Sequence, residues 1–162
     1  HDKAWMYISL YYFNKKKFNE SKNNLLKALE IDSEKIKYWK LYLKISVELE
    51  LYDEMELAFI EILSIGKLDI ETLSFLTQIL IKITHNKKLH FRLLKSIDLL
   101  PKSNENEINY LLSAIYFNLS ENKNAIIFLK KAYFYSPSKY DYYNKMFPSI
   151  PKLKVFKNLH VS

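Results

Sequence analysis

The chain has 162 residues, of which 49% are hydrophobic and 27% are charged, so it is long and apolar enough for about one folded domain. It has no cysteine, which excludes disulfides, thiolate zinc sites and iron–sulfur clusters, and its single glycine, Gly66, excludes the glycine-rich loops that bind phosphates or dinucleotides. The formal net charge of +7 comes almost entirely from lysine, since Arg92 is the one arginine.

Helices are favoured, because loops with positive φ angles can scarcely be built from one glycine. Apolar residues at i, i+3 and i+4 spacing and candidate caps predict nine helices. In chain order they cover about 3–14, 18–31, 35–49, 53–65, 70–84, 87–99, 105–119, 122–135 and, as a short last helix, 139–146. Asp53 and Glu56 resemble a capping box. Asp69, Asn86 and Ser120 precede other apolar runs and are further candidate caps.

The end of the chain differs in composition from the rest. Tyr140, Tyr142, Tyr143 and Phe147 suit a cap over the preceding helices, and a basic tail at 152–157 follows two prolines. No apolar run is long enough for a membrane-spanning helix. The chain starts with His1-Asp2-Lys3-Ala4, without an initial Met, and no signal-peptide core follows. We interpret the chain as a segment of a longer protein, with a cytoplasmic or a bacterial envelope location both open.

The chain repeats itself with a period of about 34 residues. Near the start stands Trp5-x-x-Ile8-Ser9-x-x-Tyr12, followed by Ser21-x-x-x-Leu25-x-x-Ala28. Near the end stand Asn109-x-x-Leu112-Ser113-x-x-Tyr116 and Ala125-x-x-x-Leu129-x-x-Ala132 in the same frame. The residues that close the units, Ser33, Lys67, Pro101 and Pro137, are 34, 34 and 36 positions apart.

This pattern resembles the tetratricopeptide repeat (TPR) family, in which each unit is a pair of antiparallel helices. The resemblance covers residues 2–137 as four units. They are approximately 2–35, 36–69, 70–103 and 106–139, and a capping helix with the basic tail occupies 138–162. The resemblance implies an all-α, right-handed solenoid of four helix pairs.

In the family, small residues stand where the two helices of a unit cross. The first and fourth units keep them as Ser9, Ser21, Ala28 and Ser113, Ala125, Ala132. The third unit has Thr77 and Ser96 but also Leu89. The second unit has Leu43, Met55 and Ile62, and we expect these bulky residues to push its two helices apart.

Residues that could carry chemistry are few. His85 and His90 are five positions apart, which is not the i, i+4 spacing of a metal-binding pair on a helix. Glu54, Glu56 and Glu61 are typical of a solvated helix face. No Ser, His and Asp spacing resembles a nucleophilic motif. We therefore predict a protein without enzymatic activity, metal or cofactor.

Nucleic acid and membrane surfaces are less favoured partners. A pI near 9.3 and 15% aromatic residues are compatible with RNA binding. The charge is uneven, however, because residues 36–69 carry a net charge of −3, and a single arginine provides little bidentate recognition of phosphates. The lysines do not gather on one face of one helix in the sequence pattern, which argues against a membrane-surface helix.

The TPR resemblance implies a concave groove lined by the first helix of each unit. The residues predicted to bind a peptide there are Met6, Tyr7, Leu10, Phe13, Lys37, Lys40, Lys44, Phe75, Gln78, Lys82, Tyr110, Ala114 and Phe117. The aromatic residues would be anchors, and the lysines would give charge complementarity. One TPR subclass holds the C-terminal carboxylate of chaperones with basic and amide side chains. That clamp is absent, since Met6, Leu41 and Glu71 stand at its positions.

We predict a protein-interaction module that binds an amphipathic segment with acidic residues, in the helix-in-groove mode. The main alternative, by family analogy only, is an architectural subunit of a homo- or hetero-oligomeric assembly such as a bacterial envelope machine.

Overall fold

The structure, a computed structural model, describes residues 1–66, 68–83, 86–148 and 150. This part of the chain is all-α and contains no strand. Its α-helices are α1 (Asp2–Asn14), α2 (Phe18–Ile31), α3 (Ile36–Glu48), α4 (Tyr52–Ile65), α5 (Ile70–Lys82), α6 (Lys87–Asp98), α7 (Glu105–Asn118), α8 (Asn122–Tyr135) and α9 (Tyr140–Met146). Two 3-10 helices, η1 (Lys102–Asn104) and η2 (Pro137–Lys139), precede α7 and α9. All the predicted helices are confirmed, with ends displaced by one or two residues at most.

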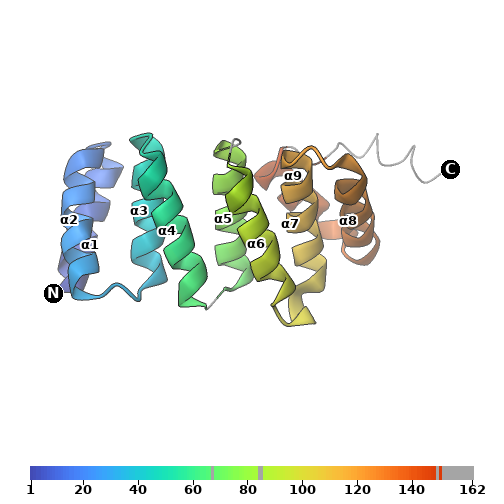
Figure 1. The fold of residues 1–162 in the computed structure, drawn as a ribbon, viewed down its shortest axis with the longest axis horizontal. Helices are drawn as coiled ribbons and strands as arrows, with labels where there is room; N and C mark the ends of the chain where they lie inside the picture. Colours follow the sequence, from blue (N-terminus) through green and yellow to red (C-terminus); the bar gives the residue numbers. More distant parts are fainter. Residues whose placement is uncertain (67, 84–85, 149, 151–162) are drawn as a thin grey trace. The chain divides into compact units, whose positions relative to one another are not determined.

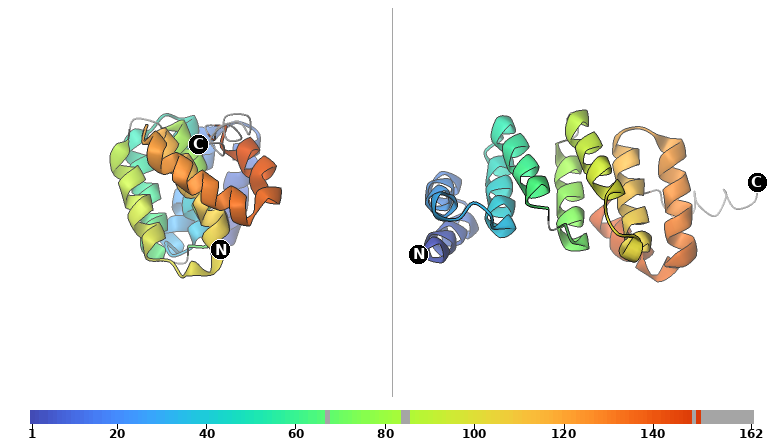
Figure 2. Two further views of the ribbon diagram at one scale, coloured as in Figure 1. Left: turned by 90° about the vertical axis from the view of Figure 1, so that its right-hand side faces the viewer. Right: turned by 60° about the horizontal axis from the view of Figure 1, so that its bottom comes forward.

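The chain divides into two compact units, which we call unit 1 (His1–Lys67) and unit 2 (Leu68–Ser162). In unit 1, α1 pairs with α2 and α3 with α4, and α3 also packs against α1 and α2. In unit 2, α7 packs against α5, α6 and α8. The two helices of each pair run antiparallel, as Figures 1 and 2 show. The expected all-α fold of successive helix pairs is therefore confirmed.

The core of each unit follows the predicted period. The residues at one repeat position of α2, α4, α6 and α8 are Leu25, Phe59, Leu93 and Leu129, and each of them is fully buried. The residues at the helix crossings are also buried, whether small, as in α1 and α2, or large, as in α3 and α4. Because the same repeat position is buried in every pair, the period of the sequence corresponds to a repeated packing of the helices.

Two serines join α1 to α2 at their crossing. The Ser9 hydroxyl donates to the Ser21 carbonyl, and the Ser21 hydroxyl donates to the Ser9 carbonyl, both at 2.8 Å. The matched pair in α7 and α8 is Ser113 and Ala125. Alanine offers no hydroxyl to Ser113, and the Ser113 Oγ atom is buried without a hydrogen-bond partner among the described residues.

The helices of the second pair are further apart than those of the first and fourth pairs, as expected, but the helices of the third pair are the most separated. The backbones of α1 and α2 and of α7 and α8 approach most closely, as their small residues require, and α3 and α4 are intermediate. The backbones of α5 and α6 approach least. Their facing positions hold four fully buried leucines, Leu76, Leu80, Leu89 and Leu93, and this bulk holds the two helices apart.

The turns within three of the pairs share one backbone geometry. Lys16, Glu50 and Ser120 adopt positive φ angles of 58°, 55° and 63°. The next residue in each turn donates a backbone hydrogen bond of 2.9 Å to the carbonyl five positions earlier, which is the Schellman arrangement. The expectation that a glycine-poor chain avoids positive φ is therefore wrong, because the hydrogen bonds of the motif hold non-glycine residues there.

Two of the predicted helix caps are confirmed and two are not. The Asp69 side chain accepts a hydrogen bond from the Thr72 amide at 2.7 Å, and the Asn86 side chain accepts one from the Leu89 amide at 3.2 Å. By contrast, α4 begins at Tyr52, one residue before the expected capping box at Asp53. Ser120 is not a cap, because it occupies the positive-φ turn position before α8.

The short helix α9 packs on the last helix pair, as predicted for a capping helix. The Tyr143 ring stacks on Tyr110 of α7, with ring centres 4.8 Å apart, and Tyr140 meets Tyr133 of α8 edge-on at 5.9 Å. The predicted basic tail at 152–157 lies outside the described residues.

Candidate functional site

The seven predicted binding residues of unit 1 lie on α1 and α3, which contact each other and lie together behind α2 and α4 in Figure 1. We call this set the α1–α3 surface: Met6, Tyr7, Leu10, Phe13, Lys37, Lys40 and Lys44. Its apolar part comes from α1. Tyr7 is 67% exposed and Leu10 is 36% exposed, while Met6 and Phe13 are half-buried. Phe13 is held by an edge-on contact with Phe18 of α2 at 5.5 Å.

The basic part of the α1–α3 surface comes from α3. Lys37 and Lys44 are exposed and Lys40 is half-buried. The Lys37 ammonium lies 5.3 Å from the centre of the Tyr38 ring, in a cation–π contact. The α1–α3 surface therefore combines exposed apolar side chains from α1 with lysines from α3.

An ion-pair network at the start of α1 fixes α3 beside it. Asp2 pairs with Lys35 and accepts a hydrogen bond of 2.5 Å from the Tyr38 hydroxyl. These two donors hold the pKa of Asp2 well below its usual range. Hydrogen bonds to Asp2 and Asp32 raise the pKa of Lys35. The network sets the relative position of the two helices that carry the α1–α3 surface.

Contrary to the expectation from the sequence, Glu54 does not lie on a solvated helix face but is half-buried. It forms an ion pair of 2.8 Å with Lys22 of α2 and accepts a hydrogen bond of 2.8 Å from the Tyr42 hydroxyl of α3. Burial of Tyr42, together with this hydrogen bond, raises the pKa of its hydroxyl. Glu54 therefore joins three helices of unit 1.

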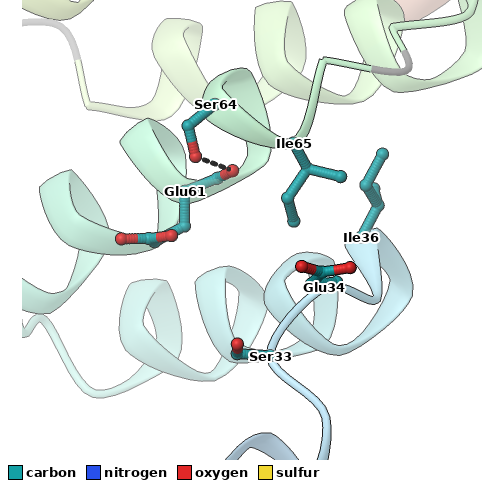
Figure 3. A pocket seen from close by; sticks show the side chains of 6 residues that line it. All are labelled: Ser33, Glu34, Ile36, Glu61, Ser64 and Ile65. Carbon is teal, nitrogen blue, oxygen red and sulfur yellow. Dashed lines mark hydrogen bonds between the residues drawn. The ribbon is translucent and has the colours of Figure 1, made fainter.

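An open hollow of about 610 Å³ lies in unit 1, where the loop between α2 and α3 faces the end of α4. Figure 3 shows the side chains around it. Its lining residues are Ser33, Glu34, Ile36, Glu61, Ser64 and Ile65. The Ser64 hydroxyl donates to the backbone carbonyl of Glu61 at 2.9 Å, so it is not aligned with a general base. The hollow thus offers two carboxylates and two isoleucines, without the arrangement of a nucleophilic site.

The predicted binding residues of unit 2 are less accessible. Tyr110 and Ala114 of α7 are fully buried, and the Tyr110 hydroxyl donates to the Ser136 carbonyl at 2.9 Å. Phe75, Gln78 and Phe117 are half-buried, and Lys82 is exposed. Tyr110 and Ala114 therefore present no surface to a partner in this conformation.

Helix α9 is the reason for the burial of Tyr110. It crosses α5 and α7 on the side away from α6 (Figures 1 and 2). A hollow of about 330 Å³ remains between α5 and α9; its lining residues are Ile70, Glu71, Ser74, Phe75, Gln78, Tyr142, Tyr143 and Met146. The face predicted to be an open groove in unit 2 is thus occupied by a helix of the same chain.

His90 belongs to a buried polar network in unit 2. One ring nitrogen, Nδ1, lies 2.8 Å from the Asn86 carbonyl, and the other, Nε2, contacts the Asn118 amide group. Asn118 also donates to the Leu80 carbonyl at 3.2 Å. Burial lowers the pKa of His90. Among the described residues, no group of three or more His, Asp or Glu side chains could hold a metal ion, and His85 lies outside them.

Exposed apolar side chains on α6, at its C-terminal end and on α8 were not predicted from the sequence. Leu99 is 81% exposed, Phe134 76%, Tyr135 66%, Phe91 55% and Ile127 49%. A comparison of repeat positions could have identified them. Asn23 and Glu30 of α2 stand at the repeat positions that Ile127 and Phe134 occupy in α8.

The fold and these surfaces define an all-α protein built from antiparallel helix pairs. No helix among the described residues combines the length and the apolar character needed to cross a bilayer. Neither a protein-family model nor a curated protein matches the chain.

Proposed function

We propose that this chain is a TPR-like, non-enzymatic protein-interaction module, and that its α1–α3 surface binds an amphipathic partner segment with acidic residues. The observation that carries the proposal is the exposed pair Tyr7 and Leu10 beside the lysines of α3. Aromatic anchors contribute large contact area at low entropic cost, and cations beside them select acidic partners.

The packing of α9 in unit 2 supports the helix-in-groove mode. Its Tyr143 stacks on Tyr110, and Tyr110 occupies the repeat position of Met6 in α1. A first helix of this repeat type therefore accepts an aromatic helix across its face. In unit 1, the described residues include no helix in that place.

The test is a selection of displayed random peptides on the immobilised full chain. We expect the selected peptides to combine aromatic or aliphatic residues with Asp or Glu. Tyr7→Ala should weaken their binding about tenfold or more, as for an interface hot spot. Replacing Lys37 and Lys44 with Glu should slow association in a salt-dependent way.

Tyr52→Ala is the matched control, because Tyr52 on α4 is 69% exposed and lies outside the α1–α3 surface. It should leave binding unchanged. Peptides that bind the Tyr7→Ala variant as tightly as the native chain would contradict the proposal.

A specific observation also favours an architectural role. Ile8 is 40% exposed and Tyr11 is 60% exposed on a second side of α1, whereas the matched residues of α3, Tyr42 and Ile45, are buried. This side of α1 is therefore suited to contact another helix pair. Concentration-dependent association in sedimentation velocity that is lost in Tyr11→Ser would support assembly, and a monomer at all concentrations would contradict it.

A further inference from the structure

The outer side of α8 carries exposed apolar side chains that the packing of α8 against α7 does not require. Ile127 is 49% exposed and Phe134 is 76% exposed. At the matched positions, α2 has the exposed polar residues Asn23 and Glu30. A solvent-facing helix stripe normally consists of polar side chains, so these apolar residues indicate a second partner.

Lysines flank this apolar stripe. At 3.6 residues per turn, Ile127 and Phe134 lie between Lys123 and Lys131, and Tyr135 extends the stripe. We call these five residues the α8 outer face. Helix α8 contains three lysines and no acidic residue. The sequence-based prediction that lysines do not gather on one face of a single helix is therefore wrong for α8.

Helix α6 has similar residues at the matched positions. Phe91, Lys95 and Leu99 correspond to Ile127, Lys131 and Tyr135, and all three are exposed. Helix α6 has four basic residues and one acidic residue, Asp98, whereas α4 of unit 1 has four acidic residues and no basic residue. An acidic residue also precedes α8, since Glu121 accepts a hydrogen bond from Asn124 at 2.8 Å. The net charge of α6 and α8 therefore remains positive even when Glu121 is counted.

We propose that the α8 outer face, with the matched residues of α6, docks on an anionic lipid bilayer. Phe134, Ile127 and Leu99 enter the boundary between headgroups and acyl chains, and the lysines contact anionic headgroups. Nucleic acid fits less well, because a single arginine is present and the aliphatic Ile127 and Leu99, which lie among the aromatic residues, offer no face for base stacking. The α8 outer face is separate from the α1–α3 surface, so the two proposals are independent.

The test is flotation of the full chain with vesicles. One set contains phosphatidylcholine alone, and the other contains phosphatidylcholine with phosphatidylserine. We expect binding to the second set only, and weaker binding at high salt. The double variant Lys123→Ala, Lys131→Ala should bind more than tenfold more weakly, since each lysine near an anionic surface contributes about fivefold. Phe134→Ser should weaken binding about tenfold.

The matched control is Ile31→Ser on α2, because Ile31 is 56% exposed at the repeat position of Tyr135. It should leave vesicle binding unchanged, and far-UV circular dichroism should be the same for all variants. The proposal is overturned if no vesicle binds, if both vesicle types bind equally, or if Ile31→Ser weakens binding as much as Phe134→Ser. Oligonucleotide binding that needs the lysines but tolerates Phe134→Ser, together with no vesicle binding, would also overturn it in favour of nucleic acid.

Discussion

Single buried hydroxyls distinguish the first helix pair from the last. Ser9→Ala removes one side of a reciprocal hydrogen-bonded contact and leaves the Ser21 hydroxyl with fewer partners. We expect it to lower the free energy of unfolding by about 1 to 2 kcal/mol. Ser113→Ala removes a hydroxyl that is already buried without a partner, and it should raise the free energy of unfolding by up to about 1 kcal/mol.

Urea unfolding followed by circular dichroism measures both variants. Ala125→Ser is a useful third variant. It places a serine opposite Ser113, just as Ser21 stands opposite Ser9 in the first pair. Equal destabilisation by Ser9→Ala and Ser113→Ala would contradict the assignment of different hydrogen bonding to the two serines.

His90 gives unit 2 a dependence on pH. Its folded-state pKa is lowered from 6.5 because the ring is buried, so the unfolded chain takes up a proton that the folded chain rejects. The free energy of unfolding should therefore fall as pH decreases below about 6.5 towards the lower folded-state pKa, by about 1.4 kcal/mol for each unit of difference between the two pKa values.

His90→Gln removes this titration and keeps a polar side chain beside Asn118. It should lower stability at pH 7 but flatten the profile in that pH window, as measured by chemical unfolding at a series of pH values. The lowered pKa values of Asp2 and Glu107 act at more acidic pH, where their ion pairs stop contributing. An unchanged profile in His90→Gln would show that another group is responsible.

At the scale of the element, the positive φ angles in the turns within the helix pairs slightly lower the free energy of unfolding. Glu50 adopts φ 55° without being glycine, and a residue with a Cβ atom loses about 1 kcal/mol or more there. Glu50→Gly should therefore raise the free energy of unfolding of unit 1 by about 1 kcal/mol. Gly66→Ala is the opposite control, because Gly66 ends α4 with φ 78° and alanine would lower stability by a similar amount. Thermal unfolding measures both, and a lower melting temperature for Glu50→Gly would contradict this account.

The helices could be predicted from sequence because the spacing of the apolar residues and the burial of their side chains have the same period. The cap at Asp69 could also be predicted, since it depends on a contact three residues away. The turn at Glu50 could not, because its positive φ is imposed by backbone hydrogen bonds between residues that carry no sequence signal. The separation of α5 and α6 depends on how leucines from two helices fill one interface, which the size of single residues does not give.

At the scale of the molecule, the exposure of the predicted binding residues differs between the two units. Tyr7 and Leu10 are accessible as expected, because no other described helix crosses α1 and α3 in unit 1. Tyr110 of α7 occupies the repeat position of Met6, and it is buried by α9. A repeat pattern specifies the face of a helix that a residue occupies, whereas the path of a later, aromatic helix decides whether that face stays open.

The most direct test of the central claim is hydrogen exchange of the full chain with and without a selected acidic, amphipathic peptide. Binding to the α1–α3 surface predicts slower exchange in α1 and α3, and unchanged exchange in α6 and α8, which carry the separate basic and apolar face. The same peptide should give no slowing in Tyr7→Ala at equal concentration. Slower exchange confined to unit 2, or slowing that persists in Tyr7→Ala, would contradict the proposal that α1 and α3 form the binding surface.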